Sequence, residues 1–309
     1  MKLEAHGLRK NYGALVALDD LTFEAGAGEV VGLLGPNGAG KTTAIRVLTT
    51  ILAPSAGTFT VAGVPHTRPA EVRRRVGVLP ESAGYPGQQT GAEFLRYHAR
   101  LFGHSRASAA STAAALLDRV GLAERGSTPV STYSRGMRQR LGIARALVND
   151  PEVVFFDEPT LGLDPAGQLQ VLALIAAVAR ERGATVLLST HFLGEVEEAC
   201  ARVLILNRGR VVVAGTVAEI TRRAAAPRRG RFRVPAEERP RALEVLARVP
   251  GVGAPQALDG RPDWLVASLE GAEVADAVRA LADADVPLLG FEQEGARLSD
   301  AFLSMTEDE

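Results

Sequence analysis

Gly35-Pro36-Asn37-Gly38-Ala39-Gly40-Lys41-Thr42 is the stretch of this 309-residue chain that decides the fold. It matches the pattern G-x-x-x-x-G-K-[ST] at every fixed position. A short apolar run at 30–34 precedes it, and apolar residues recur at helical spacing from 44 to 51. This order predicts a buried strand, a phosphate-binding loop and a helix.

The loop has the chemistry that a nucleoside triphosphate needs. Glycines let backbone N–H groups surround phosphate oxygens, and the N-terminus of the following helix favours negative charge. Lys41 adds a full positive charge, Thr42 is placed to ligate Mg²⁺, and we expect the phosphate contacts to run from Gly35 to Thr43. The loop alone does not separate a kinase, a GTPase, a helicase and a transporter ATPase.

A second apolar run, Val153 to Phe156, ends in Asp157 and Glu158. In a parallel sheet this places two carboxylates at the carboxyl edge, where Asp157 can hold Mg²⁺ and Glu158 can polarise an attacking water. Such a pair by itself is more often a solvated polar turn. Its combination with the phosphate loop favours the catalytic interpretation.

Three later stretches narrow the class. Tyr133-Ser134-Arg135-Gly136-Met137 opens a helical apolar stripe, Asp164 follows in Leu163-Asp164-Pro165, and His191 follows the apolar run 186–188. In their order and spacing these motifs make residues 1 to about 218 resemble the ABC ATPases, whose signature is usually Leu-Ser-Gly-Gly-Gln. The details resemble the daunorubicin-resistance and sodium-efflux exporter branch.

The resemblance implies the fold and the roles of further residues. It predicts a P-loop ABC ATPase domain with a parallel-sheet core, an antiparallel β subdomain and a helical subdomain, binding ATP and Mg²⁺. It places Tyr12 under the adenine ring, and His191 near the γ-phosphate or against Glu158. It also implies that Ser134 and Gly136 serve the nucleotide held by the other subunit of a dimer, and that Asp164, in the position of the family's D-loop, is a nucleotide-binding residue.

The same resemblance implies the partners. It predicts a homodimer, or a pair with a paralogous ATPase, that works on a separate transmembrane permease at the cytoplasmic face of the cell membrane. The expected function is to power export of drugs, lipids or other small molecules. A soluble ABC ATPase acting on ribosomes or DNA is an alternative, and so is a complex that hydrolyses ATP at a membrane without moving a solute.

Two positions depart from the family pattern. Arg135 stands in the signature where the family has its first glycine, and it either points to solvent or adds positive charge near the nucleotide. Glu81 stands after Val76–Leu79 and Pro80, where the family has the glutamine of the Q-loop. A carboxylate can ligate Mg²⁺ there, so Glu81 is a candidate metal ligand. Gln88 and Gln89 occur too late in the pattern to replace the Q-loop glutamine.

Composition limits the partner classes. The formal net charge is −1, without a basic footprint for nucleic acid, and the single cysteine excludes an internal disulfide. The longest apolar run, Val171 to Ala179, is 9 residues long, whereas a spanning helix needs about 20. We therefore expect a peripheral protein with no membrane span, no signal peptide and no nucleic-acid partner.

The remaining chain predicts a second domain. We divide the chain into an ATP-binding domain at 1–220, a linker at 221–231 and an accessory domain at 232–309. Strands and helices in the order β-α-β-β-α-β predict a small ferredoxin-like α+β domain, and Leu298, Phe302 and Met305 predict a closing helix. No catalytic cluster marks this half.

Overall fold

Two compact units make up the chain, Met1–Val217 and Ala218–Glu309. The computed structural model describes residues 1–223, 229–258, 261–269 and 272–294. All of the first unit therefore lies within the described residues. It contains the phosphate loop and every candidate site residue.

A six-stranded sheet runs through the first unit, in the order β10-β9-β3-β8-β7-β6 within residues 1–217. Its neighbouring strands are parallel except for β10, which pairs antiparallel with β9. The strands are β3 (Val30–Leu34), β6 (Val76–Leu79), β7 (Val153–Asp157), β8 (Thr185–Thr190), β9 (Arg202–Asn207) and β10 (Arg210–Thr216). Strands β3, β7 and β8 are buried throughout, as continuous apolar runs in a covered parallel sheet should be.

Strand order explains why distant motifs meet. Strand β8 lies between β3 and β7, and its register pairs Thr190 with Leu34 and Ser189 with Asp157. The carboxyl ends of these three parallel strands therefore share one edge of the sheet. The phosphate loop, the carboxylate pair and His191 follow those ends, and α1 (Lys41–Leu48) continues from the loop.

A second, antiparallel sheet has the order β2-β1-β4-β5 in the same unit. Its strands are β1 (Leu3–Tyr12), β2 (Leu15–Ala25), β4 (Ala56–Val61) and β5 (Val64–Pro65), which confirms the predicted antiparallel strands at the start of the chain. Apolar side chains from both sheets and from α1 form one buried cluster that includes Leu21, Phe59 and Phe155. This shared core fixes the hairpin after Tyr12 relative to the phosphate loop.

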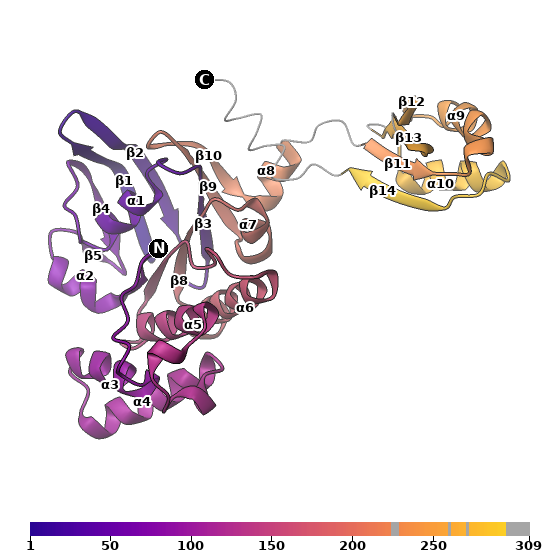
Figure 1. Cartoon of the computed structure of the whole chain (residues 1–309). Helices are drawn as coiled ribbons and strands as arrows, with labels where there is room; N and C mark the ends of the chain where they lie inside the picture. The colour runs from indigo at the N-terminus through magenta and orange to yellow at the C-terminus, as the bar shows by residue number, and fades with distance from the viewer. Residues whose placement is uncertain (224–228, 259–260, 270–271, 295–309) are drawn as a thin grey trace. The chain divides into compact units, whose positions relative to one another are not determined.

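The helical insert expected near 89–131 is present. It contains α3 (Gly91–Leu101), α4 (Arg106–Arg119) and two 3₁₀ turns, η1 (Ala123–Arg125) and η2 (Val130–Thr132). Thr90 and Glu93 form a reciprocal capping box that begins α3. The pair α3 and α4 packs beside α5 (Figure 1). The other helices here are α2 (Pro69–Arg75), α5 (Arg135–Ala146), α6 (Pro165–Arg182) and α7 (Leu193–Ala199).

The described part of the second unit has the element order expected from the sequence. A four-stranded antiparallel sheet with the order β12-β13-β11-β14 carries two helices, and Phe232, Leu246, Leu265 and Leu281 are fully buried in its core. The elements are β11 (Arg229–Arg233), η3 (Ala236–Glu238), α9 (Arg239–Ala247), β12 (Gly253–Leu258), β13 (Arg261–Ser268), α10 (Val274–Asp283) and β14 (Gly290–Glu294). The ferredoxin-like assignment stays a prediction.

The described ends of the expected linker at 221–231 lie in regular elements. Helix α8 (Val217–Arg223) extends into the start of 221–231, and β11 begins at Arg229. The arginines at 229 and 231 belong to a strand paired on both sides. The closing helix expected from Leu298, Phe302 and Met305 lies outside the described residues.

The helices can be compared with the expectation that the chain contains no membrane span. Among the described residues, none of the helices combines the length and the apolar character needed to cross a bilayer. The apolar run from Val171 to Ala179 lies inside α6, where it packs on the sheet with Val171, Ile175 and Val178 buried.

Candidate active site

The phosphate loop is held against neighbouring backbone, which explains its glycines. A Cβ on Gly35 would lie 2.4 Å from the carbonyl oxygen of Leu206, and one on Gly40 would lie 2.5 Å from that of Ala17. Gly40 also has φ +104°, a conformation that side-chain-bearing residues avoid. Glycine at these positions therefore lets β9 and β2 support the loop directly.

Lys41 is buried, with 6% of its surface exposed. Its Nζ donates to the carbonyl oxygens of Gly35 at 2.7 Å and Pro36 at 3.2 Å. It also lies 3.2 Å from Oε1 of Glu158. A buried ammonium needs such oxygen partners, and together they hold the positive charge inside the loop.

The two carboxylates after β7 have different surroundings. Asp157 Oδ1 accepts from the Thr42 hydroxyl at 3.3 Å and from the Ser189 hydroxyl at 2.5 Å. Glu158 has φ +49°, a strained value for a residue with a side chain. Its backbone N–H donates to both the carbonyl oxygen and the hydroxyl of Ser189, each at 3.1 Å. Ser189 therefore holds the Asp157 carboxylate and the Glu158 backbone from the neighbouring strand.

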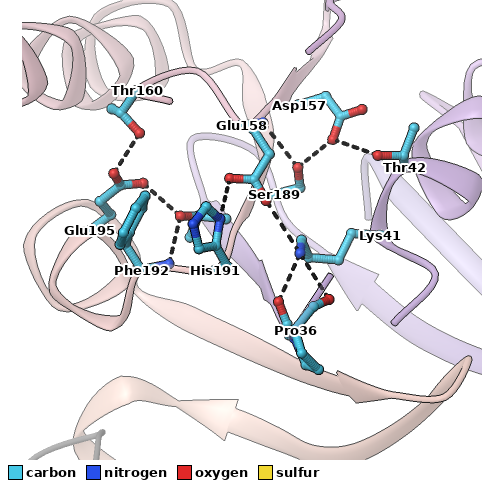
Figure 2. Close-up of polar contacts among 12 residues, drawn as sticks. Pro36, Lys41, Thr42, Asp157, Glu158, Thr160, Ser189, His191, Phe192 and Glu195 are labelled. Carbon is cyan, nitrogen blue, oxygen red and sulfur yellow. Dashed lines mark hydrogen bonds and ion pairs between the residues drawn. The ribbon is translucent and has the colours of Figure 1, made fainter. Parts of the chain in front are cut away.

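Glu158 and His191 are in direct contact. Nδ1 of His191 lies 2.8 Å from Oε2 of Glu158, so the two carboxylate oxygens of Glu158 face His191 and Lys41 respectively (Figure 2). The Glu158 side chain is 8% exposed and that of His191 is 28% exposed. Glu158 is thus nearly buried, and the more exposed His191 lies next to it in the wall of the same hollow.

Glu158, His191 and the phosphate loop line a hollow of about 540 Å³, which we call the nucleotide hollow. Tyr12 is in its wall with the loop, and Lys10 Nζ lies 5.6 Å from the centre of the Tyr12 ring. Glu81 is exposed in the wall, whereas neither Gln88 nor Gln89 lines it. The lining residues are Tyr12, Leu15, Ala17, Asn37, Gly38, Ala39, Gly40, Lys41, Thr42, Thr43, Glu81, Glu158, Leu161 and His191.

A different hollow, of about 340 Å³, is lined by Ser134, Gly136 and Asp164, and we call it the signature hollow. It is formed by the start of α5 and the loop before α6, and the Ser134 hydroxyl caps α5 by accepting from the backbone N–H of Met137 at 3.2 Å. No residue lines both hollows. The structure therefore divides the predicted nucleotide-binding residues into two separate sets on one chain.

Comparison with known proteins decides the family. The ABC transporter family model matches residues 18–161. The doxorubicin resistance ATP-binding protein DrrA of Mycobacterium tuberculosis is 40% identical over 227 residues, which are 72% of this chain and 68% of that protein. The chain belongs to the ABC transporter family. It is an ATP-binding, ATP-hydrolysing subunit that powers a transporter.

Two further similarities extend this result. The daunorubicin resistance ATP-binding protein DrrA2 of Streptomyces coeruleorubidus is 36% identical over 300 residues, covering 96% of this chain and 89% of that protein. A solved structure of the ATP binding subunit of an ABC transporter matches with a TM-score of 0.65 and 34% identity, over 72% of this chain and 93% of that one. The predicted ATPase fold and exporter branch are confirmed.

Arg135 shows how this ABC subunit departs from the usual signature. Its side chain is exposed, as one of the two expectations had it, but its guanidinium lies directly over Gly162 in the loop before Asp164. A Cβ on Gly162 would lie 2.4 Å from Cζ of Arg135. The arginine thus fills space that a glycine leaves open, and it forms one wall of the signature hollow.

Some site residues were not predicted from the sequence. Ser189 binds the Asp157 carboxylate and the Glu158 backbone N–H, and Leu15, Ala17 and Leu161 line the nucleotide hollow. Ser189 had one usable signal, its place at the end of an apolar run next to His191. Assigning it a role requires knowing that β8 is the neighbour of β7, and strand order is not readable from one sequence.

Proposed function

We propose that this ABC subunit powers export of drugs, lipids or other small molecules through a separate membrane-spanning subunit at the cytoplasmic face of the membrane. The observation that carries the proposal is the similarity to a daunorubicin resistance ATP-binding protein over 96% of this chain. The similarity includes the second unit and is not limited to the nucleotide site. Branch-specific function is expected to follow such full-length similarity.

For hydrolysis, we propose that Glu158 polarises the attacking water and that His191 orients the Glu158 carboxylate and contacts the γ-phosphate. The support is geometric: His191 lies 2.8 Å from one carboxylate oxygen of Glu158, and Lys41 lies 3.2 Å from the other. When a triphosphate enters the loop, its oxygens can take over the contacts of Lys41. Glu158 then keeps its orientation through His191 and through its backbone bonds to Ser189.

The donors beside the loop fit Mg²⁺. The Thr42 hydroxyl and the Asp157 carboxylate already lie 3.3 Å apart, and the exposed Glu81 lines the same hollow. All three offer the hard oxygen atoms that this ion prefers. Thr42 and Asp157 would hold the ion, with Glu81 as a further ligand, and the bound ion supplies positive charge to the phosphates during hydrolysis. Ser189 keeps the Asp157 carboxylate oriented for this role.

The two hollows support a dimer in which each nucleotide is bound by both chains. The first hollow has the phosphate loop and the proposed catalytic base, and the second has Ser134, Gly136 and Asp164 with the N-terminus of α5. A helix N-terminus favours a phosphate, yet this one serves no nucleotide on its own chain. A second copy, or a paralogous ATPase, would place it over the γ-phosphate.

Transport measurements test the proposal. Inverted membrane vesicles containing this chain and the membrane protein encoded beside it should accumulate doxorubicin when ATP is added, while matched vesicles with Glu158→Gln should not. Affinity capture from the native cell should recover an integral membrane protein. Capture of ribosomes or DNA-repair factors without any integral membrane protein would contradict the proposal.

A further inference from the structure

Glu195 is a buried acid outside both hollows. It lies in the first turn of α7 with 5% of its surface exposed. One carboxyl oxygen accepts from the Thr160 hydroxyl at 2.5 Å and the other from the Thr190 hydroxyl at 2.7 Å. Both threonines are fully buried, and Figure 2 shows Thr160 and Glu195 joined beside the His191 loop.

This arrangement is costly for stability. Burying a carboxyl group requires compensation by hydrogen bonds or by a cation. In the fully described first unit, no lysine, arginine or histidine forms an ion pair with Glu195, and the two hydroxyls are its side-chain partners. An apolar side chain of similar volume would fill the same space at lower cost. A role in positioning accounts for an acid there.

The two hydroxyls belong to the two loops of the active site. Thr160 lies two residues after Glu158, on the way to Asp164, and Thr190 directly precedes His191. The Thr190 oxygen also accepts from the backbone N–H of Phe192 at 3.0 Å. Its own hydrogen is therefore free to donate to Glu195, and a single carboxyl group joins the loop after β7 to the loop after β8.

We propose that Glu195 is a positioning residue for ATP hydrolysis. By holding Thr160 and Thr190 together, it keeps Glu158 and His191 at their contact distance of 2.8 Å. This inference rests on the proposed roles of Glu158 and His191. It adds a residue that touches neither the nucleotide hollow nor the reacting atoms.

The strained backbone of Glu158 explains why such a support is needed. A residue at φ +49° persists only when its surroundings hold it from several directions. Ser189 holds its N–H from one side, and the link from Glu195 through Thr160 holds the chain two residues further on. Without the second link, the loop after Glu158 gains freedom to relax, and the carboxylate turns away from His191.

A buried thiol, that of Cys200, lies near Glu195. Burial raises the pKa of Cys200 to about 12, and the negative charge of Glu195 adds to the increase. Cys200 also packs against β3, since a Cβ on Gly32 would lie 3.1 Å from its sulfur. The carboxyl group of Glu195 thus faces a packed interior, where small movements meet close contacts.

Paired threonine variants test the proposal in the dimeric ATPase. Thr160→Val and Thr190→Val each remove one hydroxyl at nearly constant shape and should lower kcat roughly 10- to 100-fold, the cost of misplacing a catalytic group. KM for ATP should change little, because the phosphate loop is untouched. Thr160→Ser and Thr190→Ser retain the hydroxyl and should restore kcat. The double valine variant should lose much less than the product of the single losses, because one break releases both loops.

Thr185→Val is the matched control. Thr185 lies at the other end of β8, is fully buried and donates to the carbonyl oxygen of Gly26 at 2.5 Å. Its variant should lose stability while the folded protein keeps its kcat. Wild-type kcat in the folded Thr160→Val and Thr190→Val proteins would overturn the proposal, whatever their loss of stability.

Glu195 variants keep the test decisive if a valine variant does not fold. Glu195→Gln retains the shape and one acceptor and should keep more activity than Glu195→Ala, again with KM unchanged. Equal, wild-type kcat in both would overturn the proposal. Glu158→Gln and His191→Ala belong in the same assay: if they also retain full turnover, the proposed catalytic roles fail. If they lose turnover while all Thr160, Thr190 and Glu195 variants keep it, the positioning role alone fails.

Discussion

The nucleotide hollow and the signature hollow are both proposed to contact nucleotide phosphates, but they differ in how far one chain alone completes them. Lys41 and Glu158 in the first, and Asp157 next to Glu158, are at most 7% exposed, and each has partners on its own chain. In the second, Ser134, Arg135 and Asp164 are exposed. The nucleotide hollow is therefore formed within one chain, whereas the signature residues lie on the exposed surface of that chain.

This difference separates binding from hydrolysis. A closed set of buried charges can hold a triphosphate on one chain, because the cost of desolvating the charges is already offset by hydrogen bonds. An exposed helix N-terminus contributes little until another surface covers it and excludes water. Nucleotide binding should therefore belong to the single chain, and turnover to the dimer.

The largest expected effect is from Glu158→Gln. It keeps the size of the side chain and removes the base, so turnover should fall by at least about 100-fold, while ATP is still bound and the dimer accumulates. Steady-state phosphate release and size-exclusion chromatography with ATP measure the two quantities. Normal turnover in this variant would remove Glu158 from the proposed mechanism.

Mixing two inactive variants tests the division between the hollows. Lys41→Ala should lose ATP binding, whereas Gly136→Asp should keep binding and lose turnover, because its carboxylate repels phosphate. The Gly136 position has room for a side chain, since the nearest atom to an added Cβ is 4.0 Å away. Random pairing of equal amounts makes about half of the dimers mixed, and in a head-to-tail arrangement each mixed dimer contains one intact site out of two. The mixture should therefore recover about one quarter of the wild-type rate.

The same mixture gives the contradicting outcome directly. If both hollows served one nucleotide within a chain, every site would have one defect and the mixture would stay inactive. A matched mixture of Lys41→Ala with Glu158→Gln is the control. Both defects then lie in the same hollow, so no mixed dimer contains an intact site.

Glu81 should have a smaller effect, seen in the Mg²⁺ requirement. If its carboxylate ligates the ion, Glu81→Ala should raise the Mg²⁺ concentration for half-maximal rate by several-fold. Glu81→Gln should be milder, because an amide oxygen remains a ligand. Titrating Mg²⁺ against the ATPase rate of the three proteins measures this, and three superimposable curves would mean that Glu81 has no role at the metal.

The smallest expected effect concerns the wall of the signature hollow. Gly162 has φ +70°, and an added Cβ would meet the Arg135 guanidinium. Gly162→Ala should lower the free energy of unfolding by about 1–2 kcal/mol from backbone strain, plus a steric part. Urea unfolding in the wild-type and Arg135→Ala backgrounds separates the two contributions, because only the steric part disappears with Arg135. Equal losses in both backgrounds would mean that the arginine moves aside freely.

Much of the nucleotide hollow could be predicted because its determinants are local in sequence. The phosphate loop needs glycines where backbone approaches backbone, and Asp157 and Glu158 need a buried strand in front of them. Both requirements can be recognised from the residue types in a short stretch of sequence around each motif. The two glycines of the pattern, together with Lys41 and Thr42, indicated the loop.

The contacts that link separate strands could not be predicted in the same way. Ser189 serves Asp157 because β8 pairs with β7, and Glu195 meets Thr160 across 35 positions of the chain. A serine after a strand and an acid in a helix are ordinary residues in any sequence. Only the strand order and the burial of Glu195 show what they do.

The C-terminal end of the expected linker shows the same dependence on strand pairing. Arg231, within 221–231, lies 3.9 Å from Glu292, and Arg233, two residues further on, pairs with Asp263 at 2.6 Å, in both cases on a neighbouring strand. Cross-strand partners of opposite charge stabilise a sheet surface. Local composition does not reveal such partners, because they are contributed by strands further along the chain.

The near absence of lysine makes the phosphate loop chemically addressable. The chain has three ε-amines, at Lys2, Lys10 and Lys41. Lys2 pairs with Glu152, Lys10 donates to the carbonyl oxygen of Ala53, and Lys41 alone faces the nucleotide hollow. If bound ATP blocks the reaction of an amine-selective reagent at Lys41, the extent of labelling of the Lys41 peptide would report nucleotide occupancy in the intact transporter. Labelling of Lys2 and Lys10 in the same sample would serve as two internal standards.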